Sequence, residues 1–266
     1  MSLTYSLDKQ LNFPLNENLD QIHRHDAGVG FLPTDLEALV AWYDAQDEGT
    51  VSTVSNLVDQ WDDKGEGGYN AVQPVVVDRF EYVQPSAVAN NYNALVNPDA
   101  ENAFSVKHVE TPSLPSVGKV YVVCAYEGGT ETDVLVNGNI FGSEDSPEKT
   151  LQLNSTSDSF QYNSEISALS VNGESYASAG YVMPLALSVV EVTFASQITS
   201  VFALGNIKTS GLFGWHGPIG EFIFTDGTES AAEATQVRNY LYNKWNIVPP
   251  STGIGTWIIG DTFVVS

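Results

Sequence analysis

The chain is poor in cysteine: Cys124 is the only one among 266 residues, so no disulfide can form within the chain. Cys124 lies in the apolar run 120–125, where a cysteine acts as a small buried hydrophobe. A reactive thiol would need an electropositive, partly exposed setting, and this run offers none. The sequence therefore predicts a structural cysteine and no disulfide framework.

Basic residues are equally scarce. Ten lysines and arginines stand against thirty-three acids, which gives a formal net charge of −23. Such a surface repels phosphate backbones and anionic lipid headgroups, so nucleic acid and membranes are excluded as expected partners. An acid excess also suits a protein that stays soluble in salty water, because salt screens the repulsion between its charges.

Long apolar runs are missing as well, since no stretch approaches the ~18 residues that a membrane-spanning helix needs. The first residues lack a basic segment followed by an apolar run, so we expect no signal peptide and synthesis in a cytoplasm. A hydrophobic fraction of 42% and an aromatic fraction of 11% are nevertheless ample for a core. The length is compatible with one large β-sandwich.

Strand and turn signals fill most of the sequence. Residues 39–45 and 222–224 predict strands, and the run 120–125, apolar on both faces, predicts a central one. Residues 190–194 alternate apolar and polar, which predicts a strand half exposed to water. Two Asn-Gly pairs, each preceded by valine, predict type I′ hairpin turns: Asn137-Gly138 and Asn172-Gly173.

Two capping-box spacings mark helix starts. Thr34 with Glu37 predicts a short helical turn, and Ser230 with Glu233 begins the only convincing helix, which Pro249-Pro250 ends. Apolar residues recur at helical spacing after this second cap: Val237, Tyr240, Leu241 and Trp245. Many short strands with one late helix predict an all-β fold of two antiparallel sheets.

Both ends of the chain carry apolar segments suited to docking. Residues 1–32 form a predicted arm and residues 249–266 a predicted hairpin tail, on either side of a jelly-roll domain at 33–248. The apolar residues that we expect to dock on a partner are Leu3, Tyr5, Leu7, Leu11 and Phe13 in the arm and Trp257, Ile258 and Phe263 in the tail. The arm can pair with a neighbour's sheet edge, and it fits equally well as the first strand of the same sandwich.

Three segments carry a family resemblance. They are residues 39–45 (Leu-Val-Ala-Trp-Tyr-Asp-Ala), the glycine-rich segment 60–71 (Gln-Trp-Asp-Asp-Lys-Gly-Glu-Gly-Gly-Tyr-Asn-Ala), and residues 217–247, which start Gly-Pro-Ile-Gly-Glu-Phe and end Lys-Trp-Asn-Ile. In this order and spacing they resemble the concanavalin A-like (laminin-G-like) jelly-roll modules common in bacteriophage structural proteins and large bacterial surface proteins. The resemblance covers roughly residues 36–247 and implies a two-sheet antiparallel jelly-roll sandwich with one C-terminal helix. The chain departs from the pattern in lacking a serine after Lys64 and in having Asn246 where the family has glycine.

We expect the residues that carry the resemblance to have structural roles, in turns and in the core. We expect Asp63 to hydrogen-bond the backbone of its turn in preference to a metal, and the glycines at 65, 67 and 68 to allow positive φ there. The predicted core anchors are Trp42, Trp61 and Trp245.

Catalytic motifs are missing. Glycanases of this superfold alternate several carboxylates along one strand, as Glu-x-Asp-x-Glu, to set two of them ~5–5.5 Å apart, and the chain has no such triplet. The pairs Glu131/Asp133 and Asp99/Glu101 lie beside glycine or proline turns, and Glu221 stands alone, suited to a hydrogen bond or ion pair at a sheet edge. There is no Gly-x-Ser-x-Gly and no phosphate-binding loop, so we predict no enzymatic activity and no catalytic residues.

Ligand-binding signals are weak. His23 and His25 with Asp26 lack a third strong metal ligand, so a surface loop is the favoured interpretation. No cofactor is expected, and calcium is left open because the acids of the predicted loops form no distinct ligand set. Trp215 with His216 is the one candidate glycan platform, and a core position for Trp215 is the favoured alternative.

Three functional hypotheses follow. The first is a non-enzymatic virion structural protein, a capsid decoration or fibre-associated component that contacts other virion proteins or copies of itself. The alternative is a carbohydrate-binding module that touches a host-surface glycan in phage adsorption or on a bacterial surface. A glycoside hydrolase is the least favoured, because the carboxylate pattern is missing.

Overall fold

The computed structural model describes residues 30–97, 107–126, 138–143, 150–154, 159–181, 185–206 and 214–249. The chain divides into two units, Met1–Phe31 and Leu32–Ser266, and only Gly30 and Phe31 of the described residues belong to the first. The second unit holds all the elements described below.

Antiparallel strands dominate this unit. The described residues form sixteen strands, and every pairing between them is antiparallel. In chain order they are β1 (Leu39–Asp44), β2 (Val51–Val54), β3 (Leu57–Trp61), β4 (Ala71–Val72), β5 (Glu81–Ser86), β6 (Tyr92–Val96), β7 (Val109–Glu110), β8 (Leu114–Tyr126), β9 (Asn139–Ser143), β10 (Leu151–Asn154), β11 (Ser159–Gln161), β12 (Ile166–Val171), β13 (Glu174–Tyr176), β14 (Leu185–Ser200), β15 (Phe202–Leu204) and β16 (Ile219–Thr225).

Helices are few among the described residues. The one α-helix is α2 (Ala231–Lys244), near the C-terminal end. The 3-10 helices are η1 (Pro33–Asp35), η2 (Glu48–Thr50), η3 (Val76–Asp78) and η4 (Ala87–Ala89). None of the helices in the described ranges has the length and apolar character that a membrane span requires. The predicted all-β class with one late helix is confirmed at this level.

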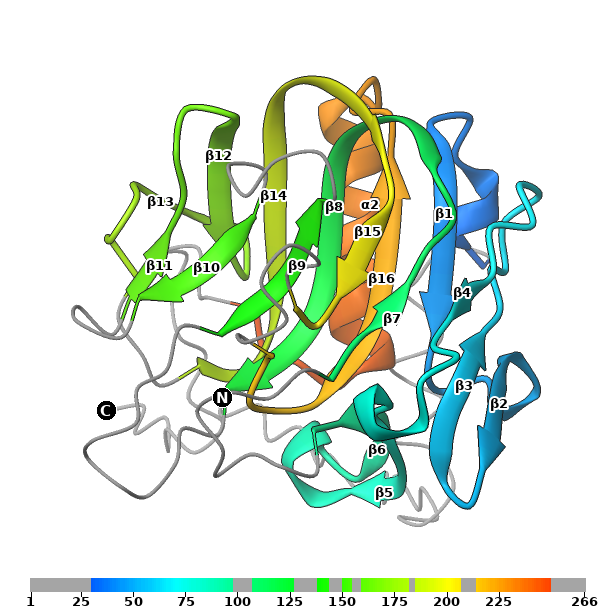
Figure 1. Ribbon diagram of the computed structural model, residues 1–266. Coiled ribbons are helices and arrows are strands. Elements are labelled where there is room, and N and C mark those ends of the chain that lie inside the picture. The colour runs from blue at the N-terminus through cyan, green and yellow to red at the C-terminus, as the bar shows by residue number, and fades with distance from the viewer. Residues whose placement is uncertain are drawn as a thin grey trace, which may run out of the picture. The chain divides into compact units, whose positions relative to one another are not determined.

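Strand β8 is an interior strand of the sheet, paired with β14 on one side and β16 on the other (Figure 1). Its run 120–125 is buried throughout, as the sequence predicts for a central strand. Val120 and Val122 face the main core, whereas Tyr121 lies on the opposite face, which α2 covers. A strand covered on both faces is apolar at every position, because neither face meets water.

The strand at 190–194 differs from its prediction. Glu191 in β14 is 5% exposed, although its alternation with Val190 and Val192 suggested a wet face. Helix α2 covers that face and supplies Arg238, which binds the Glu191 carboxylate at 3.1 Å. The apolar residues of the alternating pattern therefore face the main core, and the polar ones face a layer that α2 covers.

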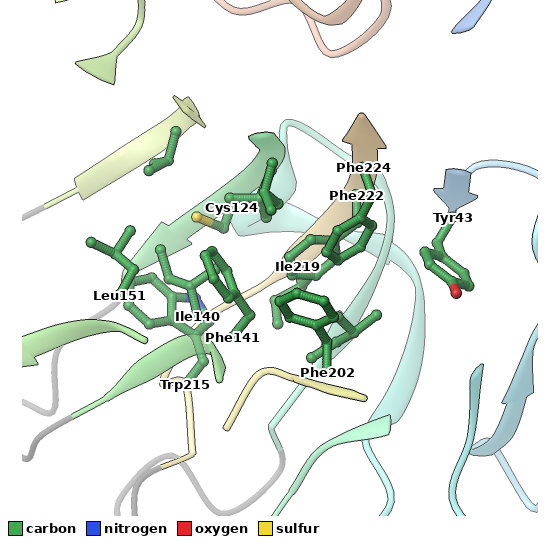
Figure 2. Packing of buried hydrophobic residues seen from close by; sticks show 14 of the residues in the cluster. Tyr43, Cys124, Ile140, Phe141, Leu151, Phe202, Trp215, Ile219, Phe222 and Phe224 are labelled. Carbon is green, nitrogen blue, oxygen red and sulfur yellow. The ribbon is translucent and has the colours of Figure 1, made fainter. Parts of the chain in front are cut away.

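Aromatic rings join the strands on either side of the core. Phe202 of β15 meets Phe224 of β16 at 5.2 Å between ring centroids, and Phe141 of β9 meets Phe194 of β14 at 6.2 Å. Strands β9 and β15 lie in front of β14 and β16 in Figure 1, and Figure 2 shows Phe202, Phe222 and Phe224 converging. This packing buries large rings that prefer tilted and edge-to-face contacts.

Local turn and cap signals hold where the backbone is described. Asn172 and Gly173 both have positive φ, 52° and 82°, and join β12 to β13 as the predicted type I′ turn. Asn137 of the other predicted turn lies outside the described residues. Asn246, in place of the family's glycine, has φ of 49°, in the left-handed region that asparagine tolerates better than most residues.

The two predicted capping boxes have different outcomes. Ser230 accepts a hydrogen bond from the Glu233 N–H, and Glu233 accepts one from the Ser230 N–H at 2.7 Å, which confirms the cap of α2. At η1 the predicted short helical turn is present at Pro33–Asp35, but its predicted cap is wrong: the Asp35 carboxylate accepts the Leu32 N–H at 2.8 Å, and Thr34 is an exposed residue inside the turn. Pro33 starts this turn one residue earlier than the predicted cap.

Replacing Ser230 with alanine is expected to cost about 1 kcal/mol of stability, because it removes the acceptor at the start of α2. Urea unfolding followed by tryptophan fluorescence measures this. Thr34→Ala is the matched control, with an expected change within about 0.5 kcal/mol. Equal losses in the two variants would contradict the assignment of the caps.

Candidate functional site

Glu221 of β16 has the most crowded polar surroundings in the described part of the chain, and it is fully buried. Its Oε1 accepts the Trp42 indole N–H at 2.7 Å and the Tyr240 hydroxyl at 3.0 Å. Its Oε2 accepts the Trp245 indole N–H at 2.6 Å and the Lys244 ammonium at 2.8 Å. Each carboxylate oxygen is therefore held by two donors.

Asp44 extends this arrangement across β1. The Lys244 ammonium binds its Oδ1 at 2.6 Å, and the Lys64 ammonium binds its Oδ2 at 2.9 Å. Lys64 also binds Asp47 at 2.8 Å and lies 4.3 Å above the Trp42 ring. Lys244 thus bridges the carboxylates of neighbouring strands, since Asp44 pairs with Glu221 in the β1–β16 register, whereas Lys64 joins Asp44 to Asp47 just after β1.

This carboxylate–lysine network, which we call the buried polar joint, holds distant parts of the chain together. It links the three resemblance segments, because Asp44, Lys64 and Glu221 come from one segment each. Trp245, which also binds Glu221, is the C-cap residue of α2. Burial raises the pKa of Glu221, and the Lys244 ammonium opposes that rise. The predicted ion pair of Glu221 is confirmed, but its predicted place at a sheet edge is wrong, because β16 lies between β1 and β8.

Asp63 organises the glycine-rich turn, as predicted. Its Oδ1 accepts the backbone N–H groups of Trp42 and Gly65, both at 2.8 Å, and its Oδ2 accepts that of Tyr69 at 3.0 Å. Of the three glycines only Gly68 has positive φ, at 63°, which corrects the expectation for the other two. The carboxylate is occupied by backbone donors, as in a structural turn.

A second buried charge cluster joins α2 to β8 and β14, and sequence analysis missed it. Lys119 binds Glu191 at 3.2 Å and Glu229 at 3.4 Å, while Arg238 also binds Glu191. The Tyr121 hydroxyl donates to Glu229 at 2.9 Å. No local sequence signal marks this cluster, because its members lie far apart in the chain.

The glycan platform expected at Trp215 and His216 is corrected by their burial. Trp215 is 0% exposed and His216 is 3% exposed. The Trp215 ring stacks on Phe160 at 6.3 Å, and its indole N–H donates to the Ala125 carbonyl at 2.9 Å. Figure 2 places it among Ile140, Phe141 and Leu151 in the core. A buried ring cannot stack on a sugar at the surface, so the alternative core position is the correct one.

Of the seven large apolar side chains that are exposed in the described part of the chain, four are valines close together in the sequence, which we call the valine surface. Their side chains are 42% to 70% exposed. Pro74, also exposed, lies among them in the segment from β4 to η3. The members of the valine surface are Val72, Val75, Val76 and Val77. Contiguous exposed apolar side chains of this kind mark interaction sites more often than isolated ones do.

Buried polar groups brace the segment that carries the valine surface. The Arg79 guanidinium donates to the Gln73 carbonyl at 2.7 Å, and the Lys107 ammonium donates to the Val77 carbonyl at 2.5 Å. The Gln73 side chain accepts the Val75 N–H at 3.0 Å. Gln73, Arg79 and Lys107 are all buried, so the valines are presented by a braced loop.

Polar and acidic residues rim the valine surface. Val72 pairs directly with Glu110 of β7 and with Gln60 of β3, so their side chains share its face of the sheet. Asp78 follows Val77 in η3 and is partly exposed. The rim therefore places two carboxylates beside an apolar centre, and the Glu110 carboxylate also contacts the His108 ring at 3.2 Å.

A cleft of about 490 Å³ is a weaker candidate for a binding site than the valine surface. It lies between the start of β1, the glycine-rich turn and Asp226. Its carboxylates are Glu37, Glu66 and Asp226. Within the described ranges no three His, Cys, Asp or Glu side chains are grouped so that they could hold a metal ion. The cleft is an acidic hollow with no feature that selects a ligand.

Several expected sites lie outside the described residues. These are the docking residues Leu3, Tyr5, Leu7, Leu11, Phe13, Trp257, Ile258 and Phe263, the histidine loop His23, His25 and Asp26, and the acid pairs Asp99/Glu101 and Glu131/Asp133. They stay predictions.

The described fold defines an all-β protein whose sequence motifs build a buried polar joint. Comparison with family models, curated proteins and solved structures finds no match for the chain.

Proposed function

We propose that this protein is a non-enzymatic structural component of a virion, in which it decorates a shell or a fibre by assembly with another protein. The observation that carries the proposal is the valine surface, held on a loop whose backbone is fixed by buried Arg79 and Lys107. A braced apolar surface binds with little loss of conformational entropy, which favours docking. The resemblance of the three motif segments supplies the virion context.

The jelly-roll sandwich is part of this proposal. Ring contacts between β15 and β16 and between β9 and β14 support two facing layers, and α2 covers the outer side of β8 and β14. The motif residues that carry the resemblance, from Trp42 to Trp245, form contacts that hold β1, β16 and α2 together. Such a scaffold leaves recognition to the surface.

The partner for the valine surface is a different protein, with an apolar centre and a basic rim. The chain has a net charge of −23, and the rim contains Glu110 and Asp78. Two copies that met through this face would bring like charges together, which costs free energy. A basic rim would turn the same charges into attraction and faster association.

The carbohydrate-binding alternative loses the residues on which it rested. Trp215 and His216 lie in the core, so neither offers a ring face to a glycan. The valine surface has no aromatic ring and suits an apolar partner better than a sugar.

Binding of designed peptides tests the docking function. The probe is a peptide that alternates leucine and lysine, compared with a leucine–glutamate peptide of the same length, by isothermal titration calorimetry on the full chain. We expect the lysine peptide to bind more tightly. Val76→Ser with Val77→Ser is expected to weaken its binding about tenfold or more, because each valine loses up to ~1.5 kcal/mol of burial.

Val54→Ser is the matched control, because Val54 is 57% exposed on the β2–β3 hairpin, outside the valine surface. Equal weakening by the control, or binding untouched by both changes, contradicts a docking role for the surface. A dimer in sedimentation that Val76→Ser abolishes would contradict the choice of a foreign partner. Mass spectrometry of purified particles tests the virion assignment separately, and absence of the chain from them contradicts it.

A further inference from the structure

A small cleft lies beside the β12–β13 hairpin, far in the sequence from the valine surface. It has a volume of about 210 Å³. We call it the tyrosine cleft; its lining residues are Val171, Asn172, Glu174, Tyr176, Tyr181 and Val248. It shares no residue with the valine surface, so its role is independent of the proposed docking function.

Two tyrosines form an aromatic corner in this cleft. The rings of Tyr176 and Tyr181 lie 5.1 Å apart between centroids and are nearly perpendicular, at 85°. Tyr181 packs on Phe160 at 5.8 Å, and Phe160 stacks on buried Trp215. The corner is therefore anchored to the core, and both tyrosines remain partly exposed.

A carboxylate lies at the same place. Glu174 is exposed, and its Oε2 accepts the Tyr176 hydroxyl at 2.9 Å. Arg238, whose side chain passes near Gly173, is engaged by Glu191 and by Thr235. Among the residues that the structure describes, no base forms an ion pair with Glu174. The cleft thus combines aromatic rings with a negative charge that is open to a ligand.

The other lining groups disfavour a neutral, hydroxyl-rich ligand. The Asn172 side chain is committed on both sides: its oxygen accepts the Val189 N–H and its nitrogen donates to Ser188. Val171 and Val248 also line the cleft; Val171 is buried, and Val248 is 84% exposed. A sugar needs several convergent polar groups, whereas an organic cation needs ring faces and one carboxylate.

We propose that the tyrosine cleft binds an organic cation, an alkylammonium or guanidinium head group. Tyrosine rings attract cations through their negative faces, and the Glu174 carboxylate adds direct charge complementarity. The net charge of −23 raises the local concentration of cations around the whole molecule. The head group belongs either to a lysine or arginine side chain of a partner or to a free quaternary ammonium compound.

Titration of the full chain with three probes tests this, followed by NMR or by tyrosine fluorescence. The probes are tetramethylammonium, acetyl-lysine amide and acetyl-arginine amide, with tert-butanol as a neutral isostere and methyl glucoside as a neutral sugar. We expect saturable binding of cations that weakens with salt, and none of either neutral probe. Tighter binding of the amino-acid probes assigns the cleft to a partner's side chain, and tighter binding of tetramethylammonium assigns it to a free compound.

Variants locate the binding. Tyr181→Leu keeps apolar bulk but removes the ring, and Glu174→Gln removes the charge, so each is expected to weaken cation binding roughly fivefold or more. Tyr181→Phe keeps the ring face and is expected to retain binding, while Glu66→Gln, at an exposed carboxylate elsewhere, is the charge control. Unchanged affinity in Tyr181→Leu, equal binding of tert-butanol, or binding of the sugar alone overturns the proposal. Circular dichroism of each variant excludes unfolding as the cause of a loss.

Discussion

Replacing Glu221 with glutamine is expected to lower the free energy of unfolding by about 3–5 kcal/mol, the cost of breaking a buried ion pair from one side. The glutamine side chain has nearly the same shape, so packing is kept and only charge and hydrogen bonding change. Four donors surround the native carboxylate, two on each oxygen. One of the two oxygens becomes an amide NH₂, which accepts nothing.

Neither orientation of the new amide resolves this conflict. With the NH₂ at the Oε2 position, it meets the Lys244 ammonium and the Trp245 indole N–H; at the Oε1 position, it meets the Trp42 indole N–H. At least one buried indole donor is left unsatisfied, and Lys244 keeps only Asp44 as a carboxylate partner.

Urea unfolding monitored by far-ultraviolet circular dichroism measures the loss for Glu221→Gln, and Glu66→Gln serves as the control because Glu66 is exposed. The control is expected to change stability by less than about 0.5 kcal/mol. A Glu221→Gln variant as stable as the control would mean that the network contributes nothing to holding β1, β16 and α2 together.

The elements that the sequence predicts correctly are those with local signals. The Ser230 cap, the Asn172-Gly173 turn and the apolar run 120–125 each occupy a few consecutive residues, and each specifies its own geometry. Asp63 belongs with them, because a short acid beside glycines bonds the backbone of its own turn.

The features that sequence reasoning missed depend on contacts between distant segments. Glu191 looks like a surface residue in an alternating strand, and only the packing of α2 buries it beside Lys119 and Arg238. Glu221 has no acidic neighbour in its own strand, and it lies beside Asp44 only because β1 pairs with β16. Pairings of this kind depend on tertiary register, which period and propensity do not encode.

The valine surface did have a sequence signal that was not used. Three consecutive valines after Pro74 break the period of two expected of a half-buried strand. Val76 and Val77 lie in the 3-10 turn η3 and Val75 precedes it as the N-cap, so a β-branched run that would suit a strand is exposed. A conflict between local propensity and observed structure is expected where function, and not folding, selects the residues.

Replacing Trp215 with alanine is expected to destabilise the protein by about 3–5 kcal/mol, as removal of a buried aromatic side chain does. The ring fills the space between Phe160 and Tyr126, and its indole N–H satisfies the Ala125 carbonyl at the end of β8. The variant therefore opens a cavity and leaves a buried backbone acceptor without its donor. Chemical unfolding followed by circular dichroism measures the change.

The same experiment separates the two interpretations of this residue. A surface platform for sugars would lose ligand binding on Trp215→Ala while stability stayed within about 0.5 kcal/mol of the wild type. A core residue loses stability whether or not a ligand is present, and Trp215→Phe recovers part of it because a ring again stacks on Phe160. Val77→Ala is the control for substitution of a surface residue, because Val77 is 70% exposed. Its expected stability is close to that of the wild type, so a large loss in this variant would place the valine surface in the core and remove the argument for docking.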